Sequence, residues 1–168
     1  MAGQDIKITG MKIKKVPVKD IPALFGGAEA LIIAVYLEIS GTANGHMVVV
    51  YQPNVAFDLV DILLGQPAGS TTQLQDMERS TLGEVGNIMG SFFLNFISDT
   101  TGMRFLPSPP AVMMDMAGAI LDSALADLFA CCDQVNIVET SFGMKDRQVS
   151  GTFLWHQCPK ARRLIDPC

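Results

Sequence analysis

Residues 80–90 read STLGEVGNIMG and place three glycines, Gly83, Gly86 and Gly90, inside an otherwise helical pattern. Glycine is a poor helix former and costs about 1 kcal/mol per residue relative to alanine. On a helical wheel with about 100° per residue, the three glycines fall on one flank of the helix. A glycine flank lets another backbone approach closely. It therefore indicates either tight packing inside the fold or a surface where a partner docks.

The same helix carries a polar stripe and an apolar seam. Four polar residues lie within roughly 60° of one another on the wheel: Ser80, Glu84, Asn87 and Ser91. Apolar residues with alternating spacings of three and four predict a buried seam on the opposite side: Leu82, Val85, Met89, Phe92 and Phe96. A polar stripe alone is also what an ordinary solvent-facing helix presents, although asparagine is a mediocre helix former.

The helix extends beyond this stretch in both directions. The candidate capping pairs at its start are Ser70 with Gln73 and Thr72 with Gln75. Its predicted end is Gly102. A shorter helix precedes it, with Asn54 as its predicted cap and Gly65 just past its end.

The rest of the chain predicts mostly strands. The first 50 residues look like strands: residues 6–8 and 11–18 alternate between apolar and polar positions, and the pair Asn44–Gly45 predicts a tight hairpin turn between two apolar runs. A second hairpin is predicted around residues 144–148, whereas the apolar stretch 111–129 is interpreted mainly as a helix. Hairpins interrupted by helices predict an α+β fold, with a largely antiparallel sheet packed against long helices.

Length and composition favour one domain over residues 1–168 and exclude several classes of protein. Apolar residues make up 49% of the chain, which is enough for a sizeable core. The net charge of −5, without a dense Lys/Arg cluster, argues against nucleic-acid binding. The start of the chain lacks the apolar centre of a signal peptide. The longest apolar run, residues 30–37, is far shorter than the roughly 20 residues of a membrane span. We therefore expect a cytoplasmic protein without membrane contact.

The four cysteines do not have the spacing of a metal site. Cys131 and Cys132 are adjacent, and Cys158 and Cys168 stand alone, so there is no CxxC pair to combine with a histidine. In a cytoplasmic protein they are expected to be reduced and buried thiols.

The stretch resembles the CheC/CheX/FliY family of chemotaxis phosphatases. The signature of that family is Ser or Asp, three residues, Glu, two residues, Asn, twenty-two residues and then Pro. This chain has Ser80, Glu84, Asn87 and, after residues 88–109, Pro110, with no gap. The second motif region of CheC also resembles two flanking segments, EVGNIMG and PPAVMMDM.

The resemblance has one clear departure. CheC proteins consist of two pseudo-symmetric halves, each opening with a motif helix, but no second ExxN occurs here. We therefore expect a single CheC-like domain that lacks the first motif helix, as CheX also has one functional site. The surface against which that helix would pack could then be covered by forming a homodimer.

What the resemblance implies is hydrolysis of the phosphoaspartate on a CheY-like receiver domain in two-component signalling. Asn87 would position the attacking water, and Glu84 would pair with the active-site lysine of the receiver. Ser80 would be a contact or packing residue, and Pro110 a backbone constraint near the site. Gly83, Gly86 and Gly90 would let the receiver loops reach the helix. The protein needs no cofactor of its own, because the receiver supplies Mg²⁺.

The sequence also bears on two alternatives, another class of enzyme and a protein without enzymatic activity. Classical hydrolase and nucleotide-binding motifs (GxSxG, the P-loop, HExxH) are absent from the sequence. The serious alternative is a non-enzymatic regulatory module that docks receiver domains or a CheD-type deamidase, because fold resemblance alone does not establish activity.

Overall fold

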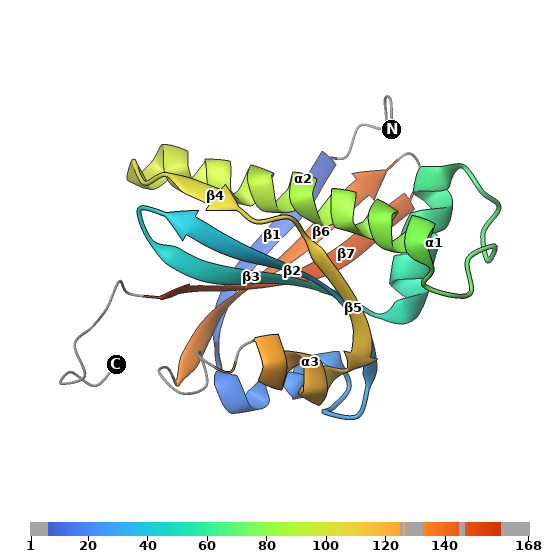
Figure 1. The fold of residues 1–168 in the computed structure, drawn as a ribbon, viewed down its shortest axis with the longest axis horizontal. Helices are drawn as coiled ribbons and strands as arrows, with labels where there is room; N and C mark the ends of the chain where they lie inside the picture. The colour runs from blue at the N-terminus through green and yellow to red at the C-terminus, as the bar shows by residue number, and fades with distance from the viewer. Residues whose placement is uncertain (1–6, 125, 127–132, 145–146, 159–168) are drawn as a thin grey trace.

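The computed structural model describes residues 7–124, 126, 133–144 and 147–158, and they form an α+β fold with one antiparallel sheet (Figure 1). The first half of the chain contains β1 (Lys7–Pro17), η1 (Val18–Asp20), η2 (Pro22–Phe25), β2 (Leu31–Gly41), β3 (Asn44–Tyr51) and α1 (Pro53–Leu64). The second half contains α2 (Asp76–Thr101), β4 (Phe105–Pro107), β5 (Ala111–Met116), α3 (Ala117–Ala124), β6 (Gln134–Met144) and β7 (Arg147–Cys158).

The sheet has seven strands and an internal repeat. Its order is β1-β6-β7-β3-β2, and both β4 and β5 pair with the outer side of β2. The chain passes through the same pattern twice: β1, short helices and the hairpin β2–β3, then β5, α3 and the hairpin β6–β7. Each repeat adds its first strand to the hairpin of the other, because β1 pairs with β6 and β5 pairs with β2. An approximate two-fold axis through the central β3–β7 pair therefore relates the two repeats.

Helices cover both faces of the sheet. Figure 1 shows α1 and α2 on one face, and α3 with the short helices η1 and η2 on the other. Strand β2 is buried on both faces: Ile33, Val35 and Leu37 belong to the core under α1 and α2, whereas Ile32 and Ala34 belong to the core on the α3 side. This explains its long apolar run, because a strand between two layers has no polar face.

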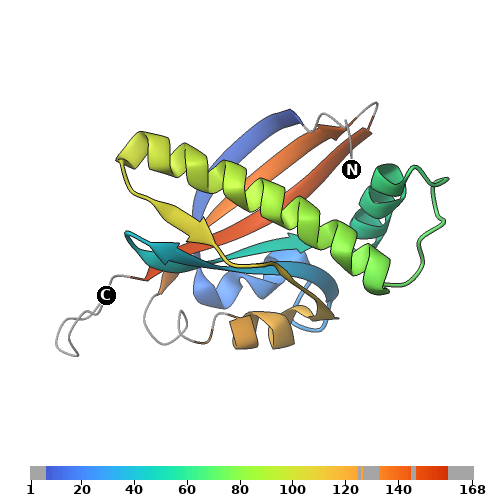
Figure 2. The ribbon, with the colours of Figure 1, turned by 45° about the horizontal axis from the view of Figure 1, so that its top comes forward.

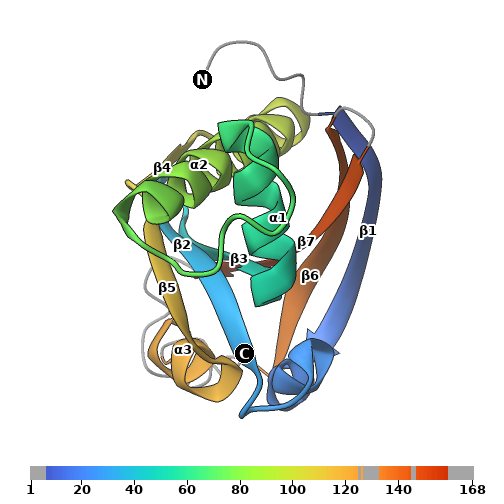
Figure 3. The ribbon, with the colours of Figure 1, turned by 90° about the vertical axis from the view of Figure 1, so that its right-hand side faces the viewer.

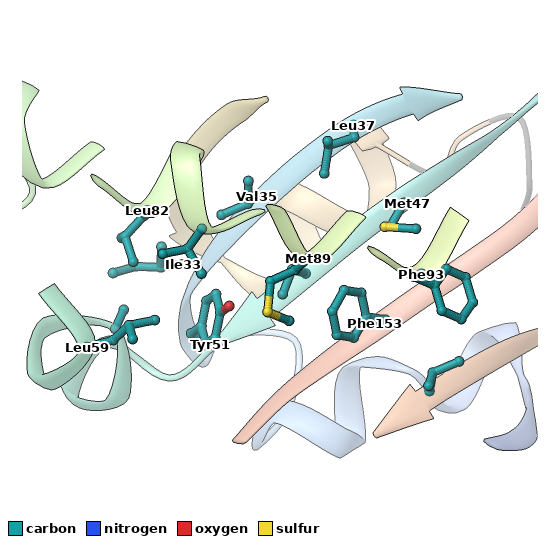
Figure 4. Packing of buried hydrophobic residues seen from close by; sticks show 14 of the residues in the cluster. Ile33, Val35, Leu37, Met47, Tyr51, Leu59, Leu82, Met89, Phe93 and Phe153 are labelled. Atoms are coloured by element: carbon teal, nitrogen blue, oxygen red, sulfur yellow. The ribbon is translucent and has the colours of Figure 1, made fainter. Parts of the chain in front are cut away.

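The core under α2 contains aromatic and sulfur-containing side chains. Figure 4 shows Leu82 of α2 beside Ile33, and Met89 and Phe93 of α2 near Phe153. The ring of Phe93 stacks on that of Phe153, with 6.1 Å between their centroids. These contacts fix α2 on the sheet, since burial of each large apolar side chain is worth about 1.5–3 kcal/mol.

The ends of both main helices use local signals, but not all of those predicted. Gly65 and Gly102 have positive φ, 67° and 72°, and end α1 and α2 as expected. The predicted N-caps were wrong. Helix α1 begins one residue before Asn54, at a proline whose fixed φ suits the first turn. The N-cap of α2 is Gln75, which forms a capping box with Glu78, so neither predicted pair caps it.

The first hairpin turns earlier than the Asn44–Gly45 pair predicted. Residues 42 and 43 form the turn, while Asn44 and Gly45 are the first residues of β3. Gly41 has a positive φ of 128°, and a Cβ at this position would lie 2.2 Å from the carbonyl oxygen of Arg104. Both facts require a glycine at the end of β2. Pairing with β7, which reaches Asn44, extends β3 through the expected turn.

The stretch 111–129 was predicted mainly as a helix and is a strand for its first six residues. Val112 and Met114 pack toward α1 and α2, and Met113 packs toward α3, which is the alternation of a strand. Pairing with β2 decides this outcome, and helix α3 begins only at Ala117. The second predicted hairpin is confirmed as the antiparallel pair β6–β7, and residues 145 and 146 between the two strands lie outside the described residues.

Across the described ranges, no helix combines the length and the apolar character that crossing a membrane requires.

Candidate functional site

The candidate site is the outward face of α2, which runs across the top of the sheet (Figure 2). Ser80, Glu84 and Asn87 are exposed, and Ser91 is half-buried. Residues three and four positions apart are neighbours on a helix surface, so Glu84 and Asn87 lie side by side. The structure therefore brings the predicted polar stripe together on one accessible surface.

Pro110 lies against this stripe, although 22 residues separate it from Asn87. Its ring contacts α2 at Gly83, where an added Cβ would lie 3.4 Å from the Pro110 Cγ. Gly83 lies one turn from both Ser80 and Asn87 on the helix, so the proline borders the polar stripe on the side of the glycines. The sequence motif gives only the number of residues between Asn87 and Pro110. The structure shows that Pro110 lies next to the polar stripe in space.

Hydrogen bonds hold the segment around Pro110 in place. The Ser108 N–H donates to the Glu38 carbonyl oxygen (2.7 Å), and the Glu38 N–H donates to Ser108 Oγ (2.9 Å). Arg79 Nη1 donates to the Val112 carbonyl oxygen over 2.8 Å and ties α2 to β5. Arg79 was not predicted as a supporting residue, and no signal in the sequence points to it.

The three glycines of the motif face the sheet and not the solvent. Gly83, Gly86 and Gly90 are all buried. A Cβ on Gly86 would lie only 2.4 Å from Val35 Cγ1, so α2 can approach β2 this closely only with a glycine there. Of the two interpretations of the glycine flank, internal packing is the one that the structure shows. The expectation that the glycines open the helix to the loops of a receiver is wrong.

The predicted apolar seam holds for half of its length. Leu82, Val85 and Met89 are buried, but Phe92 and Phe96 are 54% and 52% exposed. Phe93 and Leu94 are buried in their place, and α2 packs against β2, β4 and β5 of the sheet. A wheel drawn with one fixed apolar side does not capture this change.

The functional groups of the stripe are free to meet a partner. Within the part of the chain that the structure describes, neither the Glu84 carboxylate nor the Asn87 carboxamide has a hydrogen-bond or ion-pair partner. A carboxamide offers both a donor and an acceptor, which suits the orientation of one water molecule. A carboxylate accepts charge-assisted hydrogen bonds from an ammonium or guanidinium group. The site is a convex helix surface, so it suits a macromolecular partner better than a small ligand.

The described residues contain no group of three or more His, Cys, Asp or Glu side chains that could hold a metal ion.

Comparison with known proteins identifies relatives of this chain. Residues 77–114 match the model of the CheC-like family. The CheY-P phosphatase CheC of Bacillus subtilis (strain 168) is 30% identical over 119 residues, which are 70% of this chain and 57% of that protein. The chain thus spans little more than half the length of this relative.

Two solved structures show the same fold. Thermotoga maritima FliY superposes with a TM-score of 0.72 at 19% identity, covering 90% of this chain and 76% of that one. CheX of Borrelia burgdorferi, in a complex with CheY, BeF₃ and Mg²⁺, superposes with a TM-score of 0.51 at 16% identity, covering 91% and 84%. The family match includes Glu84 and Asn87 on α2 and Pro110, which lies against α2 at Gly83. Residues 77–114 of this chain thus match the CheC-like family, and the chain has the fold seen in FliY and CheX.

Proposed function

We propose that this protein hydrolyses the phosphoaspartate of a CheY-like receiver domain. The observation that carries the proposal is the juxtaposition of Glu84 and Asn87, both exposed and unpartnered, on one face of α2 beside Pro110. The relative from Bacillus subtilis is a CheY-P phosphatase, and the CheX structure is a complex with CheY. Both support a receiver as the partner.

Asn87 is the catalytic residue in this proposal. An acyl phosphate is already an activated group, so its hydrolysis needs mainly a water molecule held in line with the phosphorus. The Asn87 carboxamide can hold that water with its donor and its acceptor and does not need to remove a proton. The receiver brings its own Mg²⁺, which neutralises charge on the phosphoryl group.

Glu84 sets the docking register. Its carboxylate lies one turn before Asn87 and is free to pair with the active-site lysine of the receiver. Such a pair fixes the distance between the water on Asn87 and the phosphorus. Ser80 lies one further turn back, as a contact at the edge of the same surface. The buried glycines act only indirectly, because they hold α2 and Pro110 in position.

The test is the decay of phosphoaspartate on a panel of purified receivers with Mg²⁺, with and without this protein. We expect faster decay on at least one receiver and a loss of about 100-fold of that acceleration in Asn87→Ala, the size of effect that a mispositioned reactant causes. Asn95→Ala is the matched control, because it changes the same residue type at another exposed position of α2. Its rate should equal that of the wild type.

Glu84→Ala separates docking from chemistry. It should weaken binding of the receiver, whereas Asn87→Ala should keep it. Full activity of Asn87→Ala would contradict the proposed role of the carboxamide. Binding of a receiver or of a CheD-type deamidase, without any faster decay, would instead establish the non-enzymatic regulatory module.

A further inference from the structure

Helix α2 carries an apolar stripe on its solvent side, next to the polar one. The apolar stripe consists of Ile88, Phe92 and Phe96, which are 47%, 54% and 52% exposed and lie one turn apart. Contiguous apolar residues beside polar ones are typical of interaction surfaces. In the wheel interpretation two of these residues belonged to the core, but the fold leaves them outside it.

The near end of the apolar stripe adjoins the candidate site. Ile88 follows Asn87 directly and lies about 40° around the helix from Glu84, one turn further along. Any partner that covers both Glu84 and Asn87 therefore also covers Ile88. A typical stable interface buries about 800 Å² on each side, a patch roughly 30 Å across. Phe92 lies about 12 Å along the axis from Glu84 and falls inside such a patch.

We propose that Ile88 and Phe92 form the apolar half of the receiver-docking surface and select receivers with an apolar patch beside the phosphorylated aspartate. The inference rests on the proposed function and adds the chemistry of the partner. Glu84 and Asn87 recognise groups that all receivers share, namely the lysine and the phosphoryl group. Discrimination between receivers must come from neighbouring contacts, and Ile88 is the exposed large apolar residue nearest to both.

The physical basis of the selection is desolvation. A receiver with an apolar side chain opposite Ile88 gains free energy by removing both surfaces from water. A receiver with a charged side chain there has to bury that charge without a partner, which is costly. A few central apolar contacts of this kind typically contribute most of the binding energy of an interface.

The test measures initial rates of phosphoaspartate loss against receiver concentration for Ile88→Ser and Phe92→Ser. We expect KM to rise about tenfold for Ile88→Ser and about threefold for Phe92→Ser, as for contacts at the centre and nearer the edge of an interface. The value of kcat at saturating receiver should stay within about twofold, because neither residue reaches the reacting atoms. Phe96→Ser is the control with the same chemistry further from Glu84, and its KM should not change.

A binding measurement keeps the inference testable if no turnover is seen. Binding of a receiver loaded with Mg²⁺ and beryllofluoride, a mimic of the acyl phosphate, should weaken by the same factors in the two variants. Loss of binding in Ile88→Ser but not in Phe96→Ser, without catalysis by the wild type, would retain the docking surface and reject the phosphatase.

Two results would overturn the inference. One is unchanged receiver affinity in Ile88→Ser, with Tm confirming that the variant is folded. The other is a dimer in sedimentation that Phe92→Ser converts to a monomer, because the stripe would then be covered by a second copy of the chain.

Discussion

The two repeats of the sheet differ in what lies over them on the α2 face. Figure 3 shows α2 on the side of β2 and β5 and α1 between β2 and β7, whereas β1, at the opposite edge, has no helix on this face. The repeats can be compared residue by residue, because β1 and β5 end at Pro17 and Met116, and β6 and β2 begin at their partners Gln134 and Leu31. The edge of the sheet formed by β5 and β2 therefore lies beneath α2, whereas the edge formed by β1 lies beneath no helix on this face.

The side chains record this difference. The positions beneath the helices are Ile33, Val35, Leu37, Val112 and Met114, and their equivalents in the other repeat are Asn136, Val138, Thr140, Ile13 and Lys15. All five positions beneath the helices are apolar, whereas three of their equivalents are polar or charged, although Val138 and Thr140 are buried as well. A helix above the strand thus goes with a uniformly apolar face, and the same strand positions accept polar residues where no helix lies above them.

Leu37→Ala against Thr140→Ala is the strongest way to test this comparison. Leu37 is fully buried beneath α2, and its truncation should lower the free energy of unfolding by about 2–5 kcal/mol through lost burial and the cavity left behind. Thr140 occupies the equivalent position in the other repeat and is also buried, at 4% exposed, but its side chain is shorter and partly polar, so its truncation removes less apolar surface and should cost about 1 kcal/mol. Urea denaturation of both variants measures the difference. Equal losses would show that the helix is not what distinguishes the two positions.

The sequence predicted the features that depend on local patterns. Strand β1 alternates lysine with apolar residues, and the outward face of α2 follows from the wheel, so both could be read without tertiary information. The identity of β5 could not, because a six-residue apolar segment fits a helix as well as a strand until β2 pairs with it. The exposure of Phe92 could not be predicted from the sequence either, because it depends on which side of α2 meets the sheet.

The site was predictable to a similar degree. The wheel placed Glu84 and Asn87 on one face, and the spacing to Pro110 pointed to a contact that the fold makes at Gly83. The inward direction of the glycine flank was not predictable, because a wheel shows which residues share a side but not which side meets the sheet. The roles of Glu84 and Asn87 in catalysis stay predictions.

Gly86→Ala tests how closely α2 lies on the covered repeat. The new Cβ would lie 2.4 Å from Val35 Cγ1, and the β-branched Val35 side chain is fully buried and has little room to rotate. We expect a loss of about 1–3 kcal/mol in stability from overpacking, despite the better helix propensity of alanine.

Gly90→Ala is the matched control for this close approach. Its Cβ would meet Leu37 and Met47 at 3.4 and 3.5 Å, which is ordinary contact, so stability should stay the same or rise slightly. Combining Gly86→Ala with Val35→Ala should cost less than the sum of the two single changes, because the double variant removes the clash. Equal effects of Gly86→Ala and Gly90→Ala would mean that the approach of α2 to β2 is not limiting.

The smallest expected effect concerns the connection from α1 to α2, for which the described residues of the other repeat have no counterpart. The buried carboxylate of Asp61, on α1, accepts hydrogen bonds from the N–H groups of Ser70 and Thr71, at 3.0 and 2.9 Å. Burial alone would raise the pKa of Asp61, but the hydrogen bonds from Thr71 and Ser70 outweigh it and hold the pKa below its ordinary value. The charged form is therefore the one that the folded protein favours.

Asp61→Asn should lower the free energy of unfolding at pH 7 by about 1 kcal/mol, since one charge-assisted acceptor is lost. The folded pKa is depressed, so the stabilisation by the wild-type carboxylate is fully present above its unfolded pKa of about 3.9 and is lost as the pH falls through the lower folded value. The stability gap between wild type and Asp61→Asn should consequently shrink as the pH falls from about 4 to about 2, as measured by urea denaturation at each pH. A gap that stays constant over this range would show that Asp61 holds the loop by its shape and not by its charge, and α2 would then be anchored to α1 independently of pH.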